Sequence, residues 1–341
     1  MEEVIPPRTA VRHIGLALSL LTLLMTGCTW LVPPYRHDIE AARARIATGS
    51  QVADTACGPI EYATAGEGPP LLVVHGAAGG FDQGLMIGAP LIKAGYQVIA
   101  VSRFGYLRTP LPADASPEAQ ADAYACLLDA LRIPRVALVG ASAGSPSALQ
   151  FALRHPERCR ALVLLVPVVF APPAKETTAA KHSGGAKVLL DSLWDSDFFV
   201  WLAPRLTPAI IDDTLLGTPA DVVEQSSPEE QARVAKMTAE ILPVEPRRAG
   251  MRNDMNVLGS LQRVDLERIA VPTLVISTAD DRYGTYGAAL YTSVHVAGAQ
   301  FIGYTTGGHM LVGHQSDTAA AISAFLKHRS SSPPLRAAGS P

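Results

Sequence analysis

The chain has 341 residues, of which 48% are hydrophobic, and its formal net charge at pH 7 is -3. A chain of this length and apolar content can bury a large core, which excludes an intrinsically disordered protein. Its 28 lysines and arginines are scattered along the sequence and do not outnumber its 31 acidic residues. A nucleic acid is therefore not expected as a partner.

The N-terminal segment, residues 1–28, differs from the rest of the chain. Two arginines precede an apolar run over 14–24, whose length is typical of a signal-peptide core. The run ends in Met-Thr-Gly before Cys28, which resembles the lipobox of bacterial lipoproteins and implies lipidation of Cys28. The charge-free span 14–32 also meets the length of a membrane-spanning helix. The sequence predicts an exported protein that is lipid-anchored, anchored by a spanning segment, or periplasmic or secreted.

The cysteines bear on the compartment and on metal binding. If Cys28 carries a lipid, Cys57, Cys126 and Cys159 remain, and three cysteines cannot all pair within the chain. An oxidising compartment permits one disulfide, and the sequence does not choose it. Cys126 and Cys159 lie in segments predicted as helices, which favours buried free thiols there. No spacing of Cys and His fits a zinc site, so no metal is expected.

After a predicted linker over 29–50, whose second half favours a helix, short apolar runs alternate with helical segments. Strands are predicted at 51–65 (a hairpin), 71–74, 96–101, 136–140, 161–169, 273–277 and 300–305, and helices at 117–131, 146–155 and 318–328. Most of these strands are apolar throughout, which indicates a parallel sheet buried on both faces. The predicted fold is α/β, with a mostly parallel central sheet flanked by helices.

The interval 171–270 contains no comparable strand and is predicted to be a helical cap. It is inserted into a core formed by 51–170 and 271–328, and the Ser- and Pro-rich stretch 329–341 is predicted to be a disordered tail. Large apolar residues concentrate in the cap, at Leu189, Leu190, Leu193, Trp194, Phe198, Phe199, Trp201 and Leu202. They either pack the cap onto the core or line an apolar substrate pocket between the two.

The apolar run at 136–140 stops at Gly140-Ala-Ser142-Ala-Gly144. A strand, a tight turn and a helix fit this pattern. The serine would sit on a strained turn above the sheet, which requires small flanking residues such as those present. A serine hydroxyl is a poor nucleophile without a base that takes its proton and a third group that orients the base. The chain should therefore supply an acid and a histidine after Ser142.

Two later strands provide these groups. The strand at 273–277 leads to Asp280 and Asp281, and the strand at 300–305 is followed by Gly-Gly-His309. The carboxyl ends of parallel strands share one edge of a sheet, so Ser142, one aspartate and His309 can meet there. His314 is the rival base, but its spacing places it on the following helix.

The order of serine, aspartate and histidine, together with the small-residue turn, resembles that of the α/β-hydrolase family over about 51–328. The His75-Gly76 dipeptide after an early strand resembles the family's oxyanion loop. This likeness implies that the backbone N–H groups of Ala77 and Ala143 hold the oxyanion.

Two further details follow from the resemblance. Ser102-Arg-Phe-Gly-Tyr resembles the family's Asp-Arg-x-Gly-x turn, with serine in place of aspartate. The family's acid commonly stands about four residues beyond the last apolar residue of its strand. Asp280 and Asp281 stand four and five residues beyond Ile276; the likeness favours Asp281, and Asp280 stays open as the alternative.

The resemblance implies a serine hydrolase that needs no cofactor. His309, oriented by Asp281, would deprotonate Ser142, which attacks a carbonyl to form an acyl-enzyme. Hydrolysis of a carboxylic ester in a small, apolar acyl substrate is the default expectation. Lactone, amide or carbon–carbon cleavage, haloperoxidase-like activity and a non-catalytic anchored binding protein remain alternatives, because fold likeness does not settle the substrate. The sequence leaves the oligomeric state open.

Overall fold

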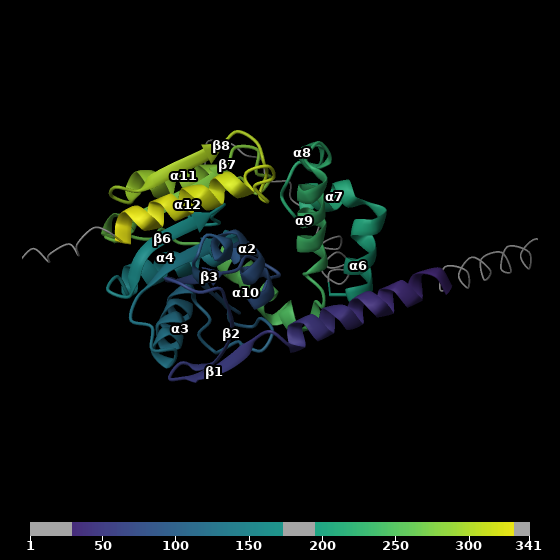
Figure 1. Cartoon of the computed structure of the whole chain (residues 1–341), viewed down its shortest axis with the longest axis horizontal. Coiled ribbons are helices and arrows are strands. Elements are labelled where there is room, and N and C mark those ends of the chain that lie inside the picture. Colours follow the sequence, from purple (N-terminus) through teal and green to yellow (C-terminus); the bar gives the residue numbers. More distant parts are fainter. Residues whose placement is uncertain (1–28, 173–194, 331–341) are drawn as a thin grey trace, which may run out of the picture.

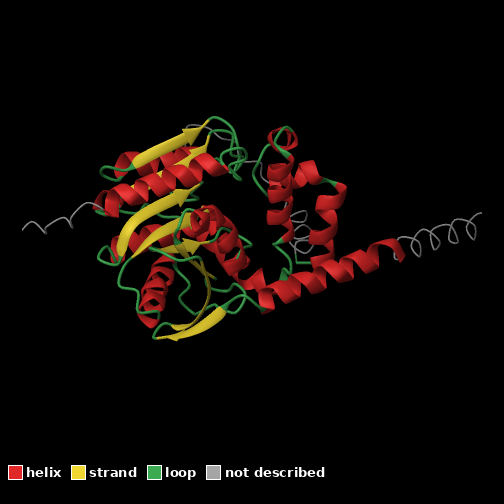
Figure 2. Ribbon diagram, in the orientation of Figure 1, coloured by secondary structure: helices red, strands yellow, loops and turns green. Residues whose placement is uncertain are grey.

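The computed structural model describes residues 29–172 and 195–330, so Cys28 and the rest of the N-terminal segment lie outside the described residues. Eight strands form one sheet in the order β1-β2-β4-β3-β5-β6-β7-β8 (Figure 2). They are β1 (Gln51–Thr55), β2 (Gly58–Ala65), β3 (Pro70–Val74), β4 (Gln97–Val101), β5 (Val136–Ala141), β6 (Cys159–Leu165), β7 (Thr273–Thr278) and β8 (Gln300–Tyr304). β1 and β2 pair antiparallel with their neighbours, and all other pairs are parallel. The predicted α/β fold is confirmed.

Helices cover both faces of the sheet because the central strands are apolar on both sides. They are α2 (Phe81–Lys93), α3 (Pro117–Ala130), α4 (Ser145–Arg154), α11 (Thr285–His295) and α12 (Gln315–Ser330). In β3, Leu72 and Val74 face the layer of α3, α4 and α11, whereas Leu71 and Val73 face the layer of α2 and α12. This alternation on successive residues is the period of a strand, and here both faces are buried.

Two of these helices, α2 and α11, lie outside the predicted elements. α2 contains Gly84, Gly88 and Pro90, which lower the intrinsic preference for a helix. The glycines are required by packing, since a Cβ at Gly84 would lie 2.9 Å from the Cβ of Ala100 on β4. Tertiary contact with the sheet therefore overrides a weak local signal in α2.

The described part of the cap, residues 195–270, contains helices and loops but no strand, as predicted. Its helices are α6 (Asp197–Leu206), α7 (Pro208–Thr214), α8 (Ala220–Glu224), α9 (Pro228–Ala239) and α10 (Arg248–Leu258), with 3-10 turns η2 (Glu245–Arg247) and η3 (Leu266–Arg268). Helices α6 to α9 stand beyond the ends toward which the arrows of β6, β7 and β8 point (Figures 1 and 2). The cap thus faces the edge of the sheet where a ligand site is expected.

The segment predicted as a linker forms a helix over 29–47, drawn in purple in Figure 1. Its residues Ile39 and Ala42 are buried in one apolar cluster with Trp201 of α6 and Leu242. The indole N–H of Trp201 also donates to Asp38 at 2.8 Å. The helix is therefore packed against the cap. No helix among the described residues is both long and apolar enough to cross a bilayer.

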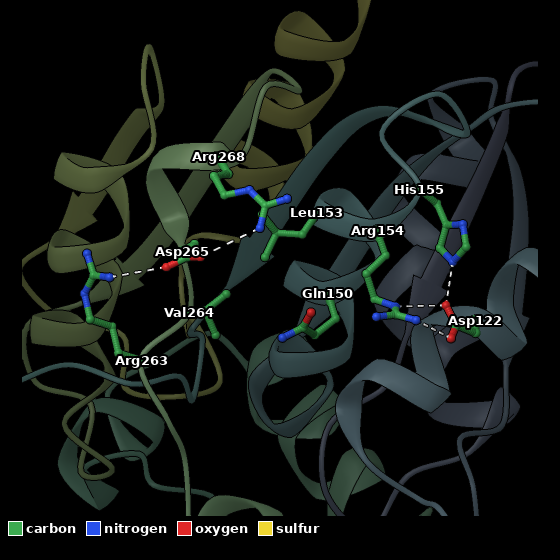
Figure 3. A pocket seen from close by; sticks show the side chains of 9 residues that line it. All are labelled: Asp122, Gln150, Leu153, Arg154, His155, Arg263, Val264, Asp265 and Arg268. Carbon is green, nitrogen blue, oxygen red and sulfur yellow. Dashed lines mark hydrogen bonds and ion pairs between the residues drawn. The ribbon is translucent and has the colours of Figure 1, made fainter.

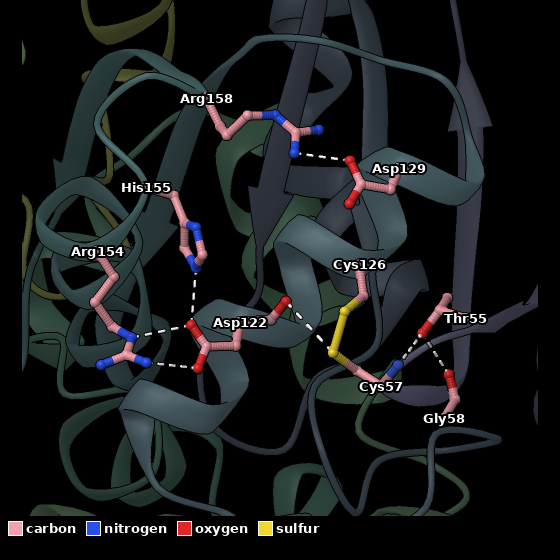
Figure 4. The surroundings of a disulfide bond; sticks show 9 residues. All are labelled: Thr55, Cys57, Gly58, Asp122, Cys126, Asp129, Arg154, His155 and Arg158. Atoms are coloured by element: carbon pink, nitrogen blue, oxygen red, sulfur yellow. Dashed lines mark hydrogen bonds and ion pairs between the residues drawn. A yellow bond between two sulfur atoms is a disulfide. The ribbon is translucent and has the colours of Figure 1, made fainter.

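A disulfide joins Cys57, in the turn between β1 and β2, to Cys126 on α3 (Figure 4). The expectation of a free thiol at Cys126 was wrong, because the fold brings together two cysteines that are 69 residues apart in sequence. Cys159 is a buried free thiol, but it begins β6 and is not on a helix. Burial raises the pKa of the Cys159 thiol to about 12, which keeps it protonated and unreactive.

Candidate active site

Ser142 occupies a strained turn at the end of β5. Its φ is 48°, in the left-handed region that non-glycine residues seldom adopt. The flanking glycines are required by close packing: a Cβ at Gly140 would lie 2.5 Å from the Cβ of Ala148, and one at Gly144 would lie 2.5 Å from the carbonyl oxygen of His75. The local sequence therefore folds as the motif predicts, with the serine between strand and helix.

The structure brings Ser142, His309 and Asp281 into one chain of hydrogen bonds. The serine Oγ lies 2.8 Å from Nε2 of His309, and Nδ1 of the same ring lies 2.8 Å from Oδ2 of Asp281. The side chain of Asp281 is fully buried, and that of His309 is 10% exposed. With the Nδ1 proton donated to the carboxylate, Nε2 is free to accept the serine proton.

The two neighbouring aspartates do different things. Asp281 contacts His309, and its carboxylate also accepts hydrogen bonds from the N–H of Tyr283 at 2.8 Å and from the hydroxyl of Thr285. Asp280 instead accepts from the backbone N–H groups of Gly307 and Gly308, at 3.1 and 2.8 Å. Asp280 thus stabilises the loop that carries His309, a role that was not predicted from the sequence.

The predicted oxyanion loop passes beside the serine. It follows β3, and a Cβ at Gly76 would lie 3.2 Å from the Cβ of Ser142. The next residue, Ala77, is exposed. Ala143 belongs to the short 3-10 turn η1 (Ser142–Gly144), directly after the serine. One predicted donor thus follows the serine directly, and the other follows the glycine that lies beside it.

Ser102, which replaces the aspartate of the family's Asp-Arg-x-Gly-x turn, forms a hydrogen bond with a carboxylate from another strand. The hydroxyl of Ser102 accepts from the N–H of Phe81 at 3.0 Å and donates to Glu61 of β2 at 2.9 Å. Glu61 is fully buried and also accepts from Nε of Arg108 at 2.7 Å. The sequence offers no signal for this partner, because Glu61 alternates with the inward-facing Ile60 and Tyr62 and so reads as a solvent-facing residue.

Buried charges join the predicted oxyanion loop to the cap. Arg247 of η2 is fully buried, donates to Oδ2 of Asp82 at 2.6 Å and to the carbonyl oxygen of Gly79, and so reaches the oxyanion loop. Arg45, on the helix over 29–47, lies 3.4 Å from the same carboxylate. Burial alone would raise the pKa of Asp82, but the charges of the two arginines outweigh it and hold that pKa below its usual value.

Main-chain and surface contacts join the loops of the acid and the base to the cap, including an exposed ion pair of Arg282 with Asp213 at 3.1 Å. The carbonyl oxygen of Gly217 accepts from the N–H of Arg282 at 2.9 Å and from the N–H of His309 at 3.1 Å. The hydroxyl of Tyr283 donates to the carbonyl of Leu215 at 2.7 Å, and its ring lies edge-on to the imidazole of His309, with centroids 4.8 Å apart.

A groove of about 600 Å³ lies elsewhere, at the C-terminal end of α4 (Figure 3). Its charged side chains are already paired: Arg154 and His155 contact Asp122 at 2.6 and 2.8 Å, and Asp265 pairs with Arg263 and Arg268 at 3.5 and 3.8 Å. Because each of these basic side chains already has an acidic partner, the groove does not indicate an anion site. Among the described residues, no group of His, Cys, Asp and Glu could hold a metal ion.

A larger cavity of about 1020 Å³ lies between the helix over 29–47 and α6 to α9. The described residues that line it do not include Ser142, Asp281 or His309. Trp201 lines the cavity and is only 2% exposed, so it serves the packing of the cap. Of the apolar cap residues expected to pack or to line a pocket, Leu189, Leu190, Leu193 and Trp194 lie outside the described residues.

Comparisons with known proteins agree with this architecture. A sequence profile of the alpha/beta hydrolase fold family matches residues 69–313. The chain is 30% identical over 271 residues to a 2-hydroxy-6-oxononadienedioate/2-hydroxy-6-oxononatrienedioate hydrolase of Paraburkholderia xenovorans, covering 73% of this chain and 84% of that protein. It is 26% identical over 290 residues to an uncharacterized hydrolase of Bacillus subtilis, covering 79% and 95%.

A solved structure is similar over most of the chain. An alpha/beta hydrolase fold protein from Nakamurella multipartita superposes with a TM-score of 0.67 at 28% identity, covering 82% of this chain and 99% of that one. The sheet order, the strained serine turn and these matches together place the chain in one class of enzymes. The protein belongs to the alpha/beta hydrolase fold family.

Proposed function

We propose that this protein is a serine hydrolase that cleaves a carboxylic ester or a related acyl substrate. His309, oriented by Asp281, takes the proton of Ser142 as the serine oxygen attacks the substrate carbonyl. The N–H groups of Ala77 and Ala143 stabilise the resulting oxyanion. His309 then protonates the leaving group, and a water molecule hydrolyses the acyl-enzyme.

One observation carries this proposal: the unbroken contact from the hydroxyl of Ser142 through both ring nitrogens of His309 to a buried carboxylate. An ordinary turn serine is not expected to have an imidazole and a buried carboxylate in line with its hydroxyl. Here the base is within proton-transfer distance before any substrate binds.

Two kinds of bond are candidates for cleavage, a carboxylic ester bond and a carbon–carbon bond. The relative at 30% identity is named as a hydrolase of a 2-hydroxy-6-oxo dienedioate, which favours carbon–carbon cleavage as the second candidate. Both reactions begin at a carbonyl carbon. A direct comparison of a p-nitrophenyl ester series with a 2-hydroxy-6-oxo dienoate as substrates decides between them, and the ester proposal fails if only the dienoate is turned over.

Covalent labelling tests the nucleophile independently of the substrate. A fluorophosphonate should form one adduct with the wild-type protein, and the Ser142→Ala variant should form none. Ser145 provides a matched control, because it is a buried serine three residues away whose hydroxyl contacts the carbonyl of Gly140. Labelling that persists in Ser142→Ala, or that is lost only in Ser145→Ala, would contradict the proposal.

We also propose that the protein is exported and held at a membrane through its N-terminal segment, with lipid on Cys28. The disulfide between Cys57 and Cys126 supports an oxidising compartment. Metabolic labelling with a fatty acid should modify the wild-type protein and leave Cys28→Ala unlabelled. Equal labelling of the two would refute the lipid anchor.

A further inference from the structure

A buried ion pair between the core and the cap lies behind the oxyanion loop, residues 75–80. Arg103 follows β4, and Asp254 lies on α10. Nη1 of the arginine donates to Oδ1 of the aspartate at 2.6 Å, and Nη2 donates to Oδ2 at 2.7 Å. The two side chains are 8% and 6% exposed. A bidentate ion pair between buried side chains fixes the orientation of the guanidinium as well as its position.

The same guanidinium holds the carbonyl groups of the loop. Nε of Arg103 donates to the carbonyl oxygen of His75 at 3.0 Å, and Nη2 donates to that of Gly76 at 2.9 Å. One side chain therefore contacts two consecutive peptide groups of the oxyanion loop and the cap.

The ring of His75 adds a second donor to the Gly76 carbonyl. Its Nε2 lies 3.0 Å from the backbone N–H of Arg103, which can only donate. Burial, followed by the charge of Arg103, holds the pKa of His75 well below its usual value, so the ring is neutral. Its proton must then be on Nδ1, which lies 2.6 Å from the oxygen of Gly76.

The orientation of the Gly76 carbonyl decides where the N–H of Ala77 points. Both groups belong to one planar trans peptide, in which C=O and N–H point in opposite directions. Two donors on the carbonyl side thus hold the Ala77 N–H toward the other side. The neighbouring N–H groups are used elsewhere: that of Gly76 donates to Gln83 at 2.8 Å and that of Ala78 to the hydroxyl of Tyr106 at 3.2 Å.

We infer that Arg103 and Asp254 are positioning residues for the oxyanion donor, so that the cap itself sets the orientation of the peptide between Gly76 and Ala77. Both act through the loop and not on the reacting atoms. The inference rests on the proposed function, because Ala77 has a donor's role only if Ser142 attacks a carbonyl. Tyr106 completes the arrangement by donating to Oδ2 of Asp254 at 2.6 Å.

Single and paired substitutions separate positioning from stability. Arg103→Met or Asp254→Leu leaves one buried charge without its partner, so each should lower both the melting temperature and kcat. The double variant removes both charges, and apolar replacement of a buried pair is often neutral for stability. It should recover the melting temperature, while kcat for a p-nitrophenyl ester stays about 10- to 100-fold below wild type and KM changes by less than about threefold.

A double variant with wild-type kcat would overturn the inference, because the pair would then serve stability alone. Arg103→Lys is the second measurement if the double variant does not fold. Lysine keeps a positive charge beside Asp254 but lacks the fork that also reaches the loop carbonyls. The rate of fluorophosphonate labelling of Ser142 should fall about 10-fold, in line with a misplaced donor, and an unchanged rate would count against the inference.

Leu128→Ala is the control for destabilisation, since Leu128 of α3 is a fully buried core residue and its truncation costs stability without a contact to the oxyanion loop. This substitution should lower the melting temperature and leave the labelling rate unchanged. An equal loss of rate in Leu128→Ala and Arg103→Lys would show a general effect of destabilisation and refute positioning. Failure of the proposed function is a separate outcome, because the wild-type protein would then not react with the phosphonate at all.

Discussion

The cap is joined to the two halves of the site by different chemistry. On the oxyanion side, Arg103 with Asp254 and Arg247 with Asp82 are buried ion pairs that reach the loop after β3. On the acid/base side, the cap meets the loops of Asp281 and His309 through main-chain carbonyls at 214–217, one tyrosine hydroxyl and a solvent-exposed ion pair of Arg282 with Asp213, which contributes little to stability.

The difference lies in what happens when one partner is lost. A buried charge without its partner keeps its full desolvation penalty, whereas a neutral carbonyl that loses one donor gives up a single hydrogen bond, which costs less. The oxyanion side should therefore dominate the stability of the cap on the core. The acid/base side should dominate the chemistry and contribute little to stability.

The largest expected effect is on catalysis, at Asp281. Asp281→Asn keeps the shape of the side chain but removes the charge that orients and stabilises the protonated imidazole of His309, so kcat should fall about 10⁴-fold. That loss corresponds to roughly 5.5 kcal/mol of transition-state stabilisation. Steady-state hydrolysis of a p-nitrophenyl ester measures it.

Asp280→Asn is the comparison variant for this prediction. Its side chain accepts from Gly307 and Gly308, and one amide oxygen can keep part of that bonding, so kcat should fall only about 10-fold or less. A larger loss of kcat in Asp280→Asn than in Asp281→Asn would reverse the assignment of the acid.

The next effect is on stability, at Arg247. Arg247→Met leaves Asp82 buried without its main partner and should lower the free energy of unfolding at pH 7 by about 3–5 kcal/mol, toward the lower end because Arg45 remains nearby. Urea unfolding followed by circular dichroism measures it. A loss below about 1 kcal/mol would remove the contrast between the two sides of the site.

Acid provides a check on the origin of that loss. The folded pKa of Asp82 lies below its unfolded value, so the stability that this carboxylate contributes is present above the unfolded pKa and is lost as pH falls through the folded pKa. The difference in unfolding free energy between wild type and Arg247→Met should therefore shrink as the pH falls below about 4. A difference that does not depend on pH would point to lost packing instead of lost charge.

The sequence predicted the parts of the molecule that depend on local pattern. The apolar strands, the small residues around Ser142 and the order of serine, acid and base are readable from neighbouring positions. The sequence narrowed the acid to two adjacent residues and favoured Asp281, the one that contacts His309.

What could not be predicted depends on contacts between distant segments. The disulfide between Cys57 and Cys126, the pair of Arg103 with Asp254 and the partnership of Ser102 with Glu61 each join residues at least 41 positions apart. A charged residue in the sequence does not reveal whether the fold buries it, so these arginines and acids read as ordinary surface residues. The buried ion pairs on the oxyanion side could therefore not be predicted from the sequence.

The smallest effect is expected at Tyr283, on the acid/base side. Tyr283→Phe removes the hydroxyl that donates to Leu215 but keeps the ring beside His309, so the free energy of unfolding should fall by only about 0.5–1.5 kcal/mol. Since Gly217 still accepts from the N–H of His309, kcat should stay within about threefold of wild type. Chemical denaturation and ester hydrolysis on one preparation measure both quantities. A loss of stability as large as that of Arg247→Met would show that a neutral hydrogen bond holds the cap as firmly as a buried charge pair, and the proposed division between the two sides would be wrong.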